Sequence, residues 1–370
     1  MDMNKFDLDT PCLVLDLEIL EENLGKMQAS ANAAGKKLRP HAKTHKCSIL
    51  AKKQLEKGAI GVCVAKVSEA EALVNSGVHG VLITGALAVE RKVKRLAAFL
   101  RRSPSLMTVI DHPKNIDLLE KHLADHDLRI DVLVDIDIGL GRTGVSPDRG
   151  LELADFVMAS DHLRLRGIQA YAGHVQHIQS YEDRRKASKE SLGRASALFR
   201  RLQAKGTGCT IFSGSGTGTS DIDLSIPELT ELQVGSYAVM DAEYMSIETA
   251  GSTALSDSFR PALTLLTSVV NVSHETHVTV DAGLKSLYRD GASPRVVTRE
   301  YSGLRYDWFG DEYGMLSPAE GSHSLPKLGA TLELVVSHCD PTVNQFDCFH
   351  IVRGDEVVDV WPIDLRGKSQ

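Results

Sequence analysis

The sequence lacks several features that mark particular classes of protein. No run approaches the roughly 20 apolar residues that span a bilayer, and the opening MDMNKFDLDTPCLVLDLE is acidic. The six cysteines include no C-x-x-C pair, so they predict neither a zinc finger nor a disulfide framework. Lysine and arginine number 42 against 49 acidic residues, and the net charge of −7 disfavours a nucleic-acid partner. We therefore expect a cytoplasmic globular protein that binds neither nucleic acid nor membrane.

From about residue 37 onward, strand-like and helix-like segments alternate regularly. VSEAEALVNSG is typical of the helical segments: Ser68 is the expected N-cap, Glu71 completes a capping box, and Gly77 ends the helix. About eight such β/α units within roughly 200 residues favour an α/β fold of the (β/α)₈ TIM-barrel type. A doubly wound sheet is the alternative, because a strand count does not prove closure. The expected strands are 36–43, 61–66, 80–85, 106–111, 130–137, 165–173, 210–217 and 230–237.

The two ends of the chain follow another pattern. Residues 1–36 contain a strand and an amphipathic helix, which we expect to pack with the C-terminal domain. Residues 37–248 form the predicted barrel. In residues 249–370, strand-like runs are separated by turn-like spacers without amphipathic helices, which predicts an antiparallel β domain. Residues 293–327 within it are predicted to be rich in loops.

The stretch LRPHAKTHK places Lys43 near the C-terminal end of the first predicted barrel strand, on the face where barrel enzymes carry their sites. A lysine becomes nucleophilic when neighbouring cations or desolvation lower the pKa of its amine. Arg39, Lys46 and protonated forms of His41 or His45 could supply that repulsion. The alternative is an ordinary basic strand end in solvent.

Two glycine-containing segments, FSGSGTG (212–218) and VGSYAVMD (234–241), end the seventh and eighth predicted strands. Barrel enzymes commonly bind phosphate with the loops after these strands, where glycines let backbone N–H groups approach the anion. A plain turn is the alternative. In a closed barrel these loops adjoin Lys43, and a nucleophilic lysine beside a phosphate site indicates pyridoxal phosphate, whose aldehyde forms an imine with lysine.

SHCDPT indicates a metal site. His338 and Asp340 are two residues apart on a predicted strand end, so they project from one face and Cys339 points away. Imidazole with carboxylate suits Mn²⁺, Fe²⁺ or Zn²⁺, although Asp-Pro is also an ordinary turn signal.

Two further segments supply polar groups on the same predicted face. GIQAYAGHVQH carries Tyr171, His174 and His177, and a histidine here is either a general base or a structural residue. Arg142 in GLGRTG is a donor for a cofactor or else a surface arginine.

These motifs resemble the D-threonine aldolases among the alanine-racemase-like, fold type III pyridoxal-phosphate enzymes. DTPCLVLDL, RPHAKTHK, KVSEA, DVLVDIDIGLGRTGV, IQAYAGHVQH, GSGTGT, TELQVGSYAVMD, DAGLKS and SHCDPT occur in the family's order along almost the whole chain. The resemblance implies a homodimer in which Lys43 bonds the cofactor, His177 is the base, and His338 and Asp340 hold a divalent ion. Manganese is the first expectation for the ion, with zinc or magnesium as alternatives. The remaining implied cofactor contacts are Arg142, Tyr171, Ser215, Gly216, Thr217, Gly235, Ser236 and Tyr237.

The implied reaction is retro-aldol cleavage of a D-3-hydroxy amino acid, with D-threonine or D-allo-threonine giving glycine and acetaldehyde. Related D-serine dehydratases place His and Cys at the metal, so Asp340 favours an aldolase, while the adjacent Cys339 leaves a shifted ligand open. A D-serine or D-3-hydroxyaspartate dehydratase and a 3-hydroxyaspartate aldolase are alternatives. A non-catalytic cofactor carrier and a cofactor-free Schiff-base aldolase acting on sugar phosphates are others. Asp281 and Lys285 either line the pocket or stabilise a hairpin.

Overall fold

The computed structural model describes residues 3–251, 254–319 and 324–370. The chain divides into two compact units. The barrel unit comprises Lys26–Lys43, Ser48–Gly235 and Gly367–Gln370, and the β unit comprises Met1–Gly25, Thr44–Cys47 and Ser236–Arg366. The predicted domain limits after residues 36 and 248 stay a prediction. Within the described part of the chain, no helix combines the length and apolar character needed to cross a bilayer.

The barrel unit contains an eight-stranded parallel sheet in the order β3-β10-β9-β8-β7-β6-β5-β4. Its two edges join through a parallel bridge between His41 and Cys63, whose N–H donates to the Pro40 carbonyl at 2.7 Å. The sheet is therefore closed, and the doubly wound alternative is wrong. Each predicted strand segment overlaps one observed strand, and β8 begins two residues before its predicted segment. The strands are β3 Lys37–Leu38, β4 Cys63–Val64, β5 Leu82–Ile83, β6 Met107–Ile110, β7 Ile130–Ile136, β8 Leu163–Ala170, β9 Ile211–Gly214 and β10 Glu231–Leu232.

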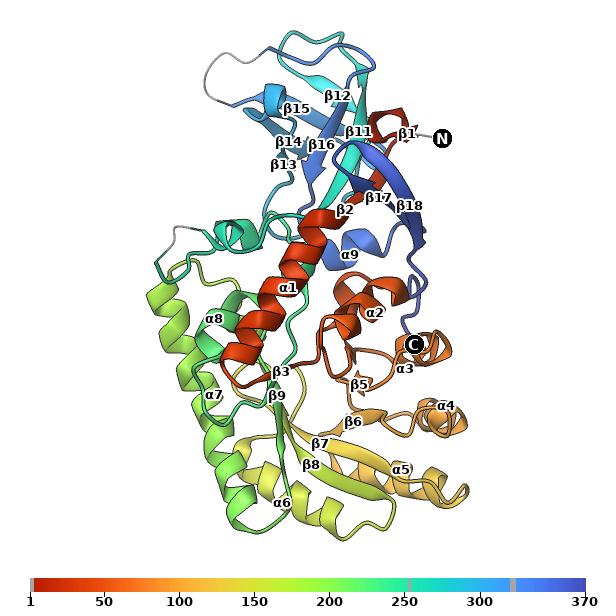
Figure 1. Cartoon of the computed structure of the whole chain (residues 1–370), viewed down its shortest axis with the longest axis vertical. Helices are drawn as coiled ribbons and strands as arrows, with labels where there is room; N and C mark the ends of the chain where they lie inside the picture. The colour runs from red at the N-terminus through yellow and green to blue at the C-terminus, as the bar shows by residue number, and fades with distance from the viewer. Residues whose placement is uncertain (1–2, 252–253, 320–323) are drawn as a thin grey trace. The chain divides into compact units, whose positions relative to one another are not determined.

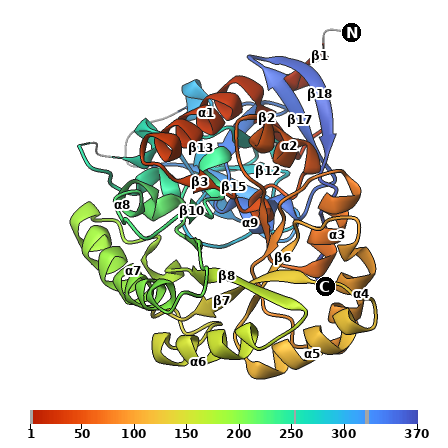
Figure 2. The same ribbon diagram turned by 60° about the horizontal axis from the view of Figure 1, so that its bottom comes forward.

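Helices follow the strands, and α4 to α7 lie outside β6 to β8 (Figure 2). The capping prediction for α3 is wrong by two residues. Lys66 is the N-cap, and the Glu69 carboxylate accepts the N–H groups of Ala65 and Lys66 at 2.9 and 3.1 Å, so Glu69 rather than Glu71 closes the first turn. The helices are α2 Ser48–Glu56, α3 Val67–Asn75, α4 Glu90–Leu100, α5 Pro113–Ala124, α6 Pro147–Met158, α7 Tyr181–Ala204 and α8 Ser220–Asp223.

The β unit is a ten-stranded sheet in the order β1-β18-β17-β2-β11-β12-β15-β14-β13-β16, much of it visible in Figure 1. Its pairs are antiparallel except β2 with β17, which are parallel, so the predicted antiparallel domain is confirmed with one parallel pair inside it. The strands are β1 Met3–Asn4, β2 Cys12–Asp16, β11 Leu263–Asn271, β12 Val278–Val280, β13 Arg295–Val296, β14 Leu304–Trp308, β15 Gly314–Pro318, β16 Thr331–Val335, β17 Cys348–Arg353 and β18 Glu356–Pro362.

Helix α1 Leu17–Ala33 directly follows β2, and its residues belong to the β unit up to Gly25 and to the barrel unit from Lys26. The short helix α9 Cys339–Val343 belongs to the β unit. The predicted loop-rich segment 293–327 instead carries β13, β14 and β15, while its residues 320–323 lie outside the described residues.

Candidate active site

Lys43 lies just beyond β3, in the 3-10 turn Ala42–Thr44, and its side chain is half-buried. The backbone leading to it is fixed, because the His41 N–H donates to the Val234 carbonyl at 2.9 Å, beyond the end of β10. The His41 ring is fixed as well. Its Nδ1 accepts the Lys43 N–H at 3.4 Å, and its Nε2 lies 3.2 Å from the Thr84 hydroxyl. The barrel therefore places this lysine at the carboxyl end of its first strand.

Two of the basic residues near Lys43, Arg39 and His45, are not the exposed cations that the sequence suggested. Arg39 is buried, and its guanidinium pairs with the Glu231 carboxylate at 2.8 and 3.1 Å. The Glu231 carboxylate therefore compensates the charge of Arg39, and the predicted repulsion between Arg39 and Lys43 is wrong. His45 is fully buried and accepts the N–H of Cys47 at 3.2 Å.

A layer of buried polar side chains crosses the barrel interior near the carboxyl ends of the strands. Gln169 is at its centre: its amide nitrogen donates to the Thr84 carbonyl at 3.1 Å and to the Asp135 carboxylate at 2.9 Å. Its amide oxygen accepts from Gln233 at 3.1 Å, and Gln233 also donates to the Ser213 hydroxyl at 2.8 Å. Sequence reasoning missed this layer, although single polar residues inside buried strand runs are a readable signal.

Arg142 and Tyr171, from the loops after β7 and β8, lie together: the guanidinium carbon is 5.6 Å from the centre of the tyrosine ring. The Arg142 loop is tied to the polar layer, because the neighbouring Thr143 hydroxyl donates to Asp135 at 2.9 Å. Burial raises the pKa of Asp135 to about 6, against hydrogen bonds from Gln169 and Thr143 and the charge of Arg142.

The glycine loop, residues 214–219 after β9, is shaped by a close neighbour. A Cβ on Gly216 would lie 2.4 Å from the side-chain oxygen of Gln176, and one on Gly218 would lie 2.0 Å from the Gln176 carbonyl oxygen. Ser215, directly before Gly216, is left-handed, with φ of +72°. These glycines are thus required by the approach of Gln176, a reason that the sequence argument about anions did not include.

Asp223, on α8, bonds side chains of this loop. Its carboxylate is fully buried and accepts hydroxyl hydrogen bonds from Ser188 and Thr219, each at 2.5 Å, and from Ser215. Burial raises the pKa of Asp223 to about 6, against these hydrogen bonds. The carboxylate oxygens are therefore engaged by hydroxyl groups, and Ser215 is drawn toward Asp223.

The two histidines after β8 are His174 and His177. Both side chains are exposed, and His174 Nε2 lies 3.3 Å from the Ser191 hydroxyl on α7. The segment that follows His177 is anchored on α7, where the fully buried Arg184 donates to the carbonyls of Ile178 and Gln179 at 2.7 and 3.1 Å. His177 is therefore an exposed imidazole directly before a well-anchored segment.

In the β unit, His338 and Asp340 do meet, but not on a strand. β16 ends at Val335, and His338 is the N-cap residue of α9, whose first turn contains Asp340. The predicted strand end is wrong, yet His338 Nε2 lies 3.5 Å from an Asp340 carboxylate oxygen. Cys339 is buried, and its thiol and N–H donate to Met240 and Asp241 at 3.1 and 3.2 Å.

The donor set fits a divalent ion. His338 Nδ1 lies 2.9 Å from an Asp290 oxygen, which leaves Nε2 facing Asp340. Burial opposes protonation, but Asp340, Asp290 and the charge of Asp241 raise the pKa of His338 to about 9. Among the described residues, no group of three His, Cys, Asp or Glu side chains has metal-ligating geometry. One imidazole and one carboxylate fit an ion that keeps other positions for water or substrate.

The remaining predicted residues divide between cofactor candidates and structural groups. Gly235 ends its stretch of the barrel unit, and the buried Ser236 and Tyr237 begin the next stretch of the β unit. Asp281 accepts hydroxyl hydrogen bonds from Thr10 and Thr267, each at 2.6 Å, which is a structural role. Lys285 forms an exposed ion pair with Glu312.

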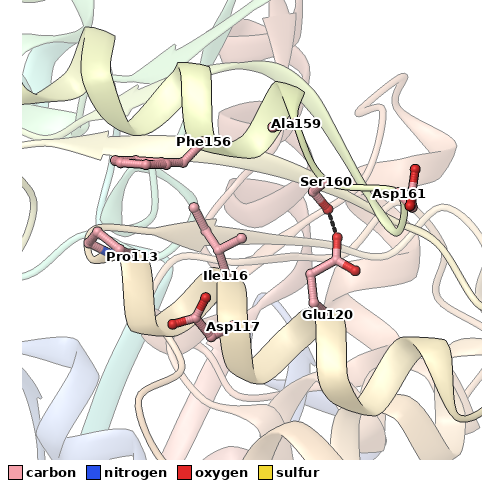
Figure 3. A pocket seen from close by; sticks show the side chains of 8 residues that line it. All are labelled: Pro113, Ile116, Asp117, Glu120, Phe156, Ala159, Ser160 and Asp161. Carbon is pink, nitrogen blue, oxygen red and sulfur yellow. Dashed lines mark hydrogen bonds between the residues drawn. The ribbon is translucent and has the colours of Figure 1, made fainter.

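A groove on the barrel exterior, between α5 and α6, does not match this chemistry (Figure 3). It is lined by Ile116 and Phe156 together with the acids Asp117 and Asp161, and one wall is closed by a hydrogen bond from Ser160 to Glu120. It presents no amine and no cationic group, so we do not assign it to the site.

The barrel unit's own groups fit a phosphorylated aldehyde. They are a lysine amine after β3, a loop after β9 with hydroxyl and N–H donors, and a guanidinium on an aromatic ring. In the turn that Gly216 precedes, the Gly218 N–H donates to the Gln176 side chain at 3.1 Å and the Thr219 N–H to the Gly216 carbonyl at 3.3 Å, so the backbone of this loop is fixed.

Comparison with known proteins gives two family matches. Residues 15–243 match the model described as "Alanine racemase, N-terminal domain", and residues 262–352 match a serine dehydratase domain model.

Among curated proteins, a D-threonine aldolase of an Arthrobacter species is 38% identical over 98% of this chain and 94% of its own length. A 3-hydroxy-D-aspartate aldolase of Paracoccus denitrificans is 36% identical over 99% of this chain and 94% of its own. The crystal structure of D-threonine aldolase from Filomicrobium marinum superposes with a TM-score of 0.94 at 36% identity, covering 100% of this chain and 98% of that one. Relatives named as dehydratases are more distant.

Proposed function

We propose that this protein is a lyase that cleaves D-3-hydroxy amino acids. The chain belongs to the alanine racemase family, and it is similar to aldolases along its whole length. D-Threonine and D-allo-threonine would give glycine and acetaldehyde. One observation of the structure carries the proposal: Lys43 follows β3, the glycine loop follows β9, and only β10 lies between these strands in the closed barrel.

Pyridoxal phosphate would supply an aldehyde for the substrate amine and a ring that withdraws electrons from Cα. Lys43 would hold that aldehyde, and Arg142 with Tyr171 would flank the ring. The phosphate would be held by Ser215, Gly216, Thr217, Gly235, Ser236 and Tyr237.

A divalent ion would supply positive charge that lowers the pKa of the substrate's 3-hydroxyl. His338 would bind it through Nε2, because Nδ1 faces Asp290, and Asp340 would be the second ligand. We propose manganese, with zinc or magnesium as alternatives. His177 would take the hydroxyl proton. Because its ring is exposed, it would return this proton to solvent. As the Cα–Cβ bond breaks, the hydroxyl-bearing carbon would leave as the aldehyde.

A specialised 3-hydroxyaspartate aldolase is the second candidate, supported by the Paracoccus relative. A dehydratase is less well supported, because relatives with that name are more distant and Cys339 is buried against Met240 and Asp241.

The test is a substrate panel on protein loaded with pyridoxal phosphate and Mn²⁺. D-Threonine, D-allo-threonine, D-3-hydroxyaspartate and their L isomers are compared by the rate of aldehyde release. We expect release from the D isomers alone, and the ratio of kcat/KM between threonine and hydroxyaspartate decides between the two aldolase candidates. No aldehyde from any D substrate would contradict the proposal.

The proposal also includes a cytoplasmic homodimer with no nucleic-acid or membrane partner. The resemblance in sequence supports the dimer, and sedimentation of the purified protein tests it. A single species at the monomer mass would contradict that part alone.

A further inference from the structure

Gln176 occupies a central place between the glycine loop and the segment that carries His177. It lies after the 3-10 turn Gly173–Val175, directly before His177, and its side chain is only 1% exposed. Its amide nitrogen donates to the Thr219 hydroxyl at 3.0 Å and to the Ala172 carbonyl at 3.2 Å. Its amide oxygen accepts the Gly218 N–H at 3.1 Å. One side chain thus joins the turn after β8 to the loop after β9.

The fit of Gln176 is specific to a primary amide. A buried side chain here has to donate twice and accept once, and a carboxylate or an alkyl group cannot do both. The contact is also sterically exclusive, because Cβ atoms on Gly216 and Gly218 would lie 2.4 and 2.0 Å from Gln176 oxygens. The two glycines and the glutamine therefore form one interlocked unit. Movement of Gln176 would release the loop, and movement of the loop would leave the buried amide without its partners.

The outer ends of this unit are fixed too. Thr219 donates to the buried Asp223, which also accepts from Ser188 on α7, and Arg184 on α7 anchors the carbonyls after His177. The glycine loop and the His177 segment are thereby held against the same helix.

We propose that Gln176 is a positioning residue that fixes the phosphate loop and the His177 segment as one body, so that cofactor phosphate binding and proton transfer depend on the same amide. The inference rests on the proposed function, since it takes the glycine loop as the phosphate site and His177 as the base. Gln176 acts through the Gly218 N–H and through the backbone that carries the imidazole.

The first test separates phosphate binding from general stability. Protein freed of cofactor is titrated with pyridoxal phosphate and with pyridoxal, which lacks the phosphate, and binding is followed by absorbance. For Gln176→Ala we expect the affinity for pyridoxal phosphate to fall about tenfold or more, while that for pyridoxal changes less than about threefold. Gln176→Glu keeps the size and the acceptor but loses both donors, and it should lower the same ratio further by repelling the phosphate. An unchanged ratio in both variants would overturn the inference.

The matched control is Gln203→Ala, which removes an exposed glutamine near the end of α7 and should leave the ratio unchanged. Thermal melting of each cofactor-free variant shows whether it folds. If Gln176→Ala does not fold, the same ratio in Gln176→Glu decides the question.

The second test concerns His177. At saturating cofactor we expect Gln176→Ala to lower kcat about tenfold, and Gln176→Ala combined with His177→Ala to be no slower than His177→Ala by more than about twofold. Losses that multiply in the double variant would overturn the link between the two residues. Failure of the proposed function has a different signature, because the unaltered protein would then bind no pyridoxal phosphate or release no aldehyde, and that outcome would overturn both.

Discussion

Lys43 is the residue that we propose bonds the cofactor, and its replacement gives an unambiguous prediction. Lys43→Ala should abolish the visible absorbance that pyridoxal phosphate gives when bound to a lysine, together with all measurable turnover. Lys37→Ala is the control, since Lys37 is exposed on the same strand, β3. Full activity in Lys43→Ala would refute the cofactor assignment.

His177 carries the proton-transfer part of the account. Loss of a general base typically lowers a rate about 10² to 10⁴-fold, so His177→Ala should lose kcat in that range while the cofactor spectrum stays unchanged. His174→Ala is the natural comparison, because that ring contacts Ser191 on α7 and we expect a smaller loss. An effect below about threefold in His177→Ala would mean that another group takes the proton.

Asp290 is a residue that sequence inspection did not single out. Its carboxylate faces His338 Nδ1 at 2.9 Å, and the Ser337 hydroxyl anchors its loop by donating to the Ala292 carbonyl at 2.6 Å. Carboxylates behind a metal-binding histidine typically account for about 10- to 100-fold in metal affinity. Asp290→Asn should therefore weaken Mn²⁺ binding by that factor in a calorimetric titration of metal-free protein. The exposed Asp311→Asn should not, and equal affinities in the two variants would exclude this role.

At the scale of single elements, the sequence predicts what depends on local pattern. The barrel strands are recovered because their apolar pattern is local, and the Lys43, Arg142 and His338 segments are recognisable as motifs. The residues that support these segments, Gln176, Asp135 and Asp290, are not recognisable in the same way. Gln176 bonds Gly218 and Asp290 bonds His338, and each of these partners is more than 40 positions away in the sequence. Such contacts exist only once the chain is folded.

The SHCDPT segment shows how a correct pairing can follow from a wrong element. Alternation along a strand predicted that His338 and Asp340 share a face. The chain instead starts a short helix at Cys339, where Pro341 is tolerated in the first turn because its missing N–H would have no intrahelical partner there. The Asp241 carboxylate accepts the Cys339 N–H and fixes the start of this helix, a contact from almost 100 residues away that sequence could not reveal.

The short α8 supplies a prediction about pH. Burial raises the pKa of Asp223 to about 6 from an ordinary value of 3.8. The folded protein thus binds a proton on the Asp223 carboxyl more tightly than the unfolded chain does. The contribution of this protonation to the free energy of unfolding is fully present below pH 3.8 and is lost as the pH rises through about 6.

Asp223→Asn removes that titration. Relative to the unaltered protein, its free energy of unfolding should therefore rise between pH 4 and 7, by up to about 3 kcal/mol. Urea unfolding of cofactor-free protein across this range measures the difference, with Asp117→Asn, at an exposed position on α5, as control. A difference that does not vary with pH would contradict the assignment.

At the scale of the whole molecule, the order of motifs is the most informative feature of the sequence. The lysine, arginine, histidine, glycine loop and proposed metal pair occur along one chain, and the similarity to two aldolases covers at least 98% of this chain and 94% of theirs. Barrel closure was the step that sequence could not prove, because it depends on the pairing of the first and second strands through His41 and Cys63. With closure established, Lys43 and the glycine loop become neighbours at one end of the barrel.

The central claim is that the enzyme breaks the Cα–Cβ bond of a D-3-hydroxy amino acid, and the products of a single substrate test it most directly. Protein loaded with pyridoxal phosphate and Mn²⁺ is incubated with D-threonine, and all carbon products and ammonia are quantified. We predict equal amounts of glycine and acetaldehyde, with the yield falling after thorough chelation and returning when the ion is restored. Formation of 2-oxobutanoate and ammonia in place of glycine would contradict the account, because it would show that the 3-hydroxyl leaves while the carbon chain stays intact.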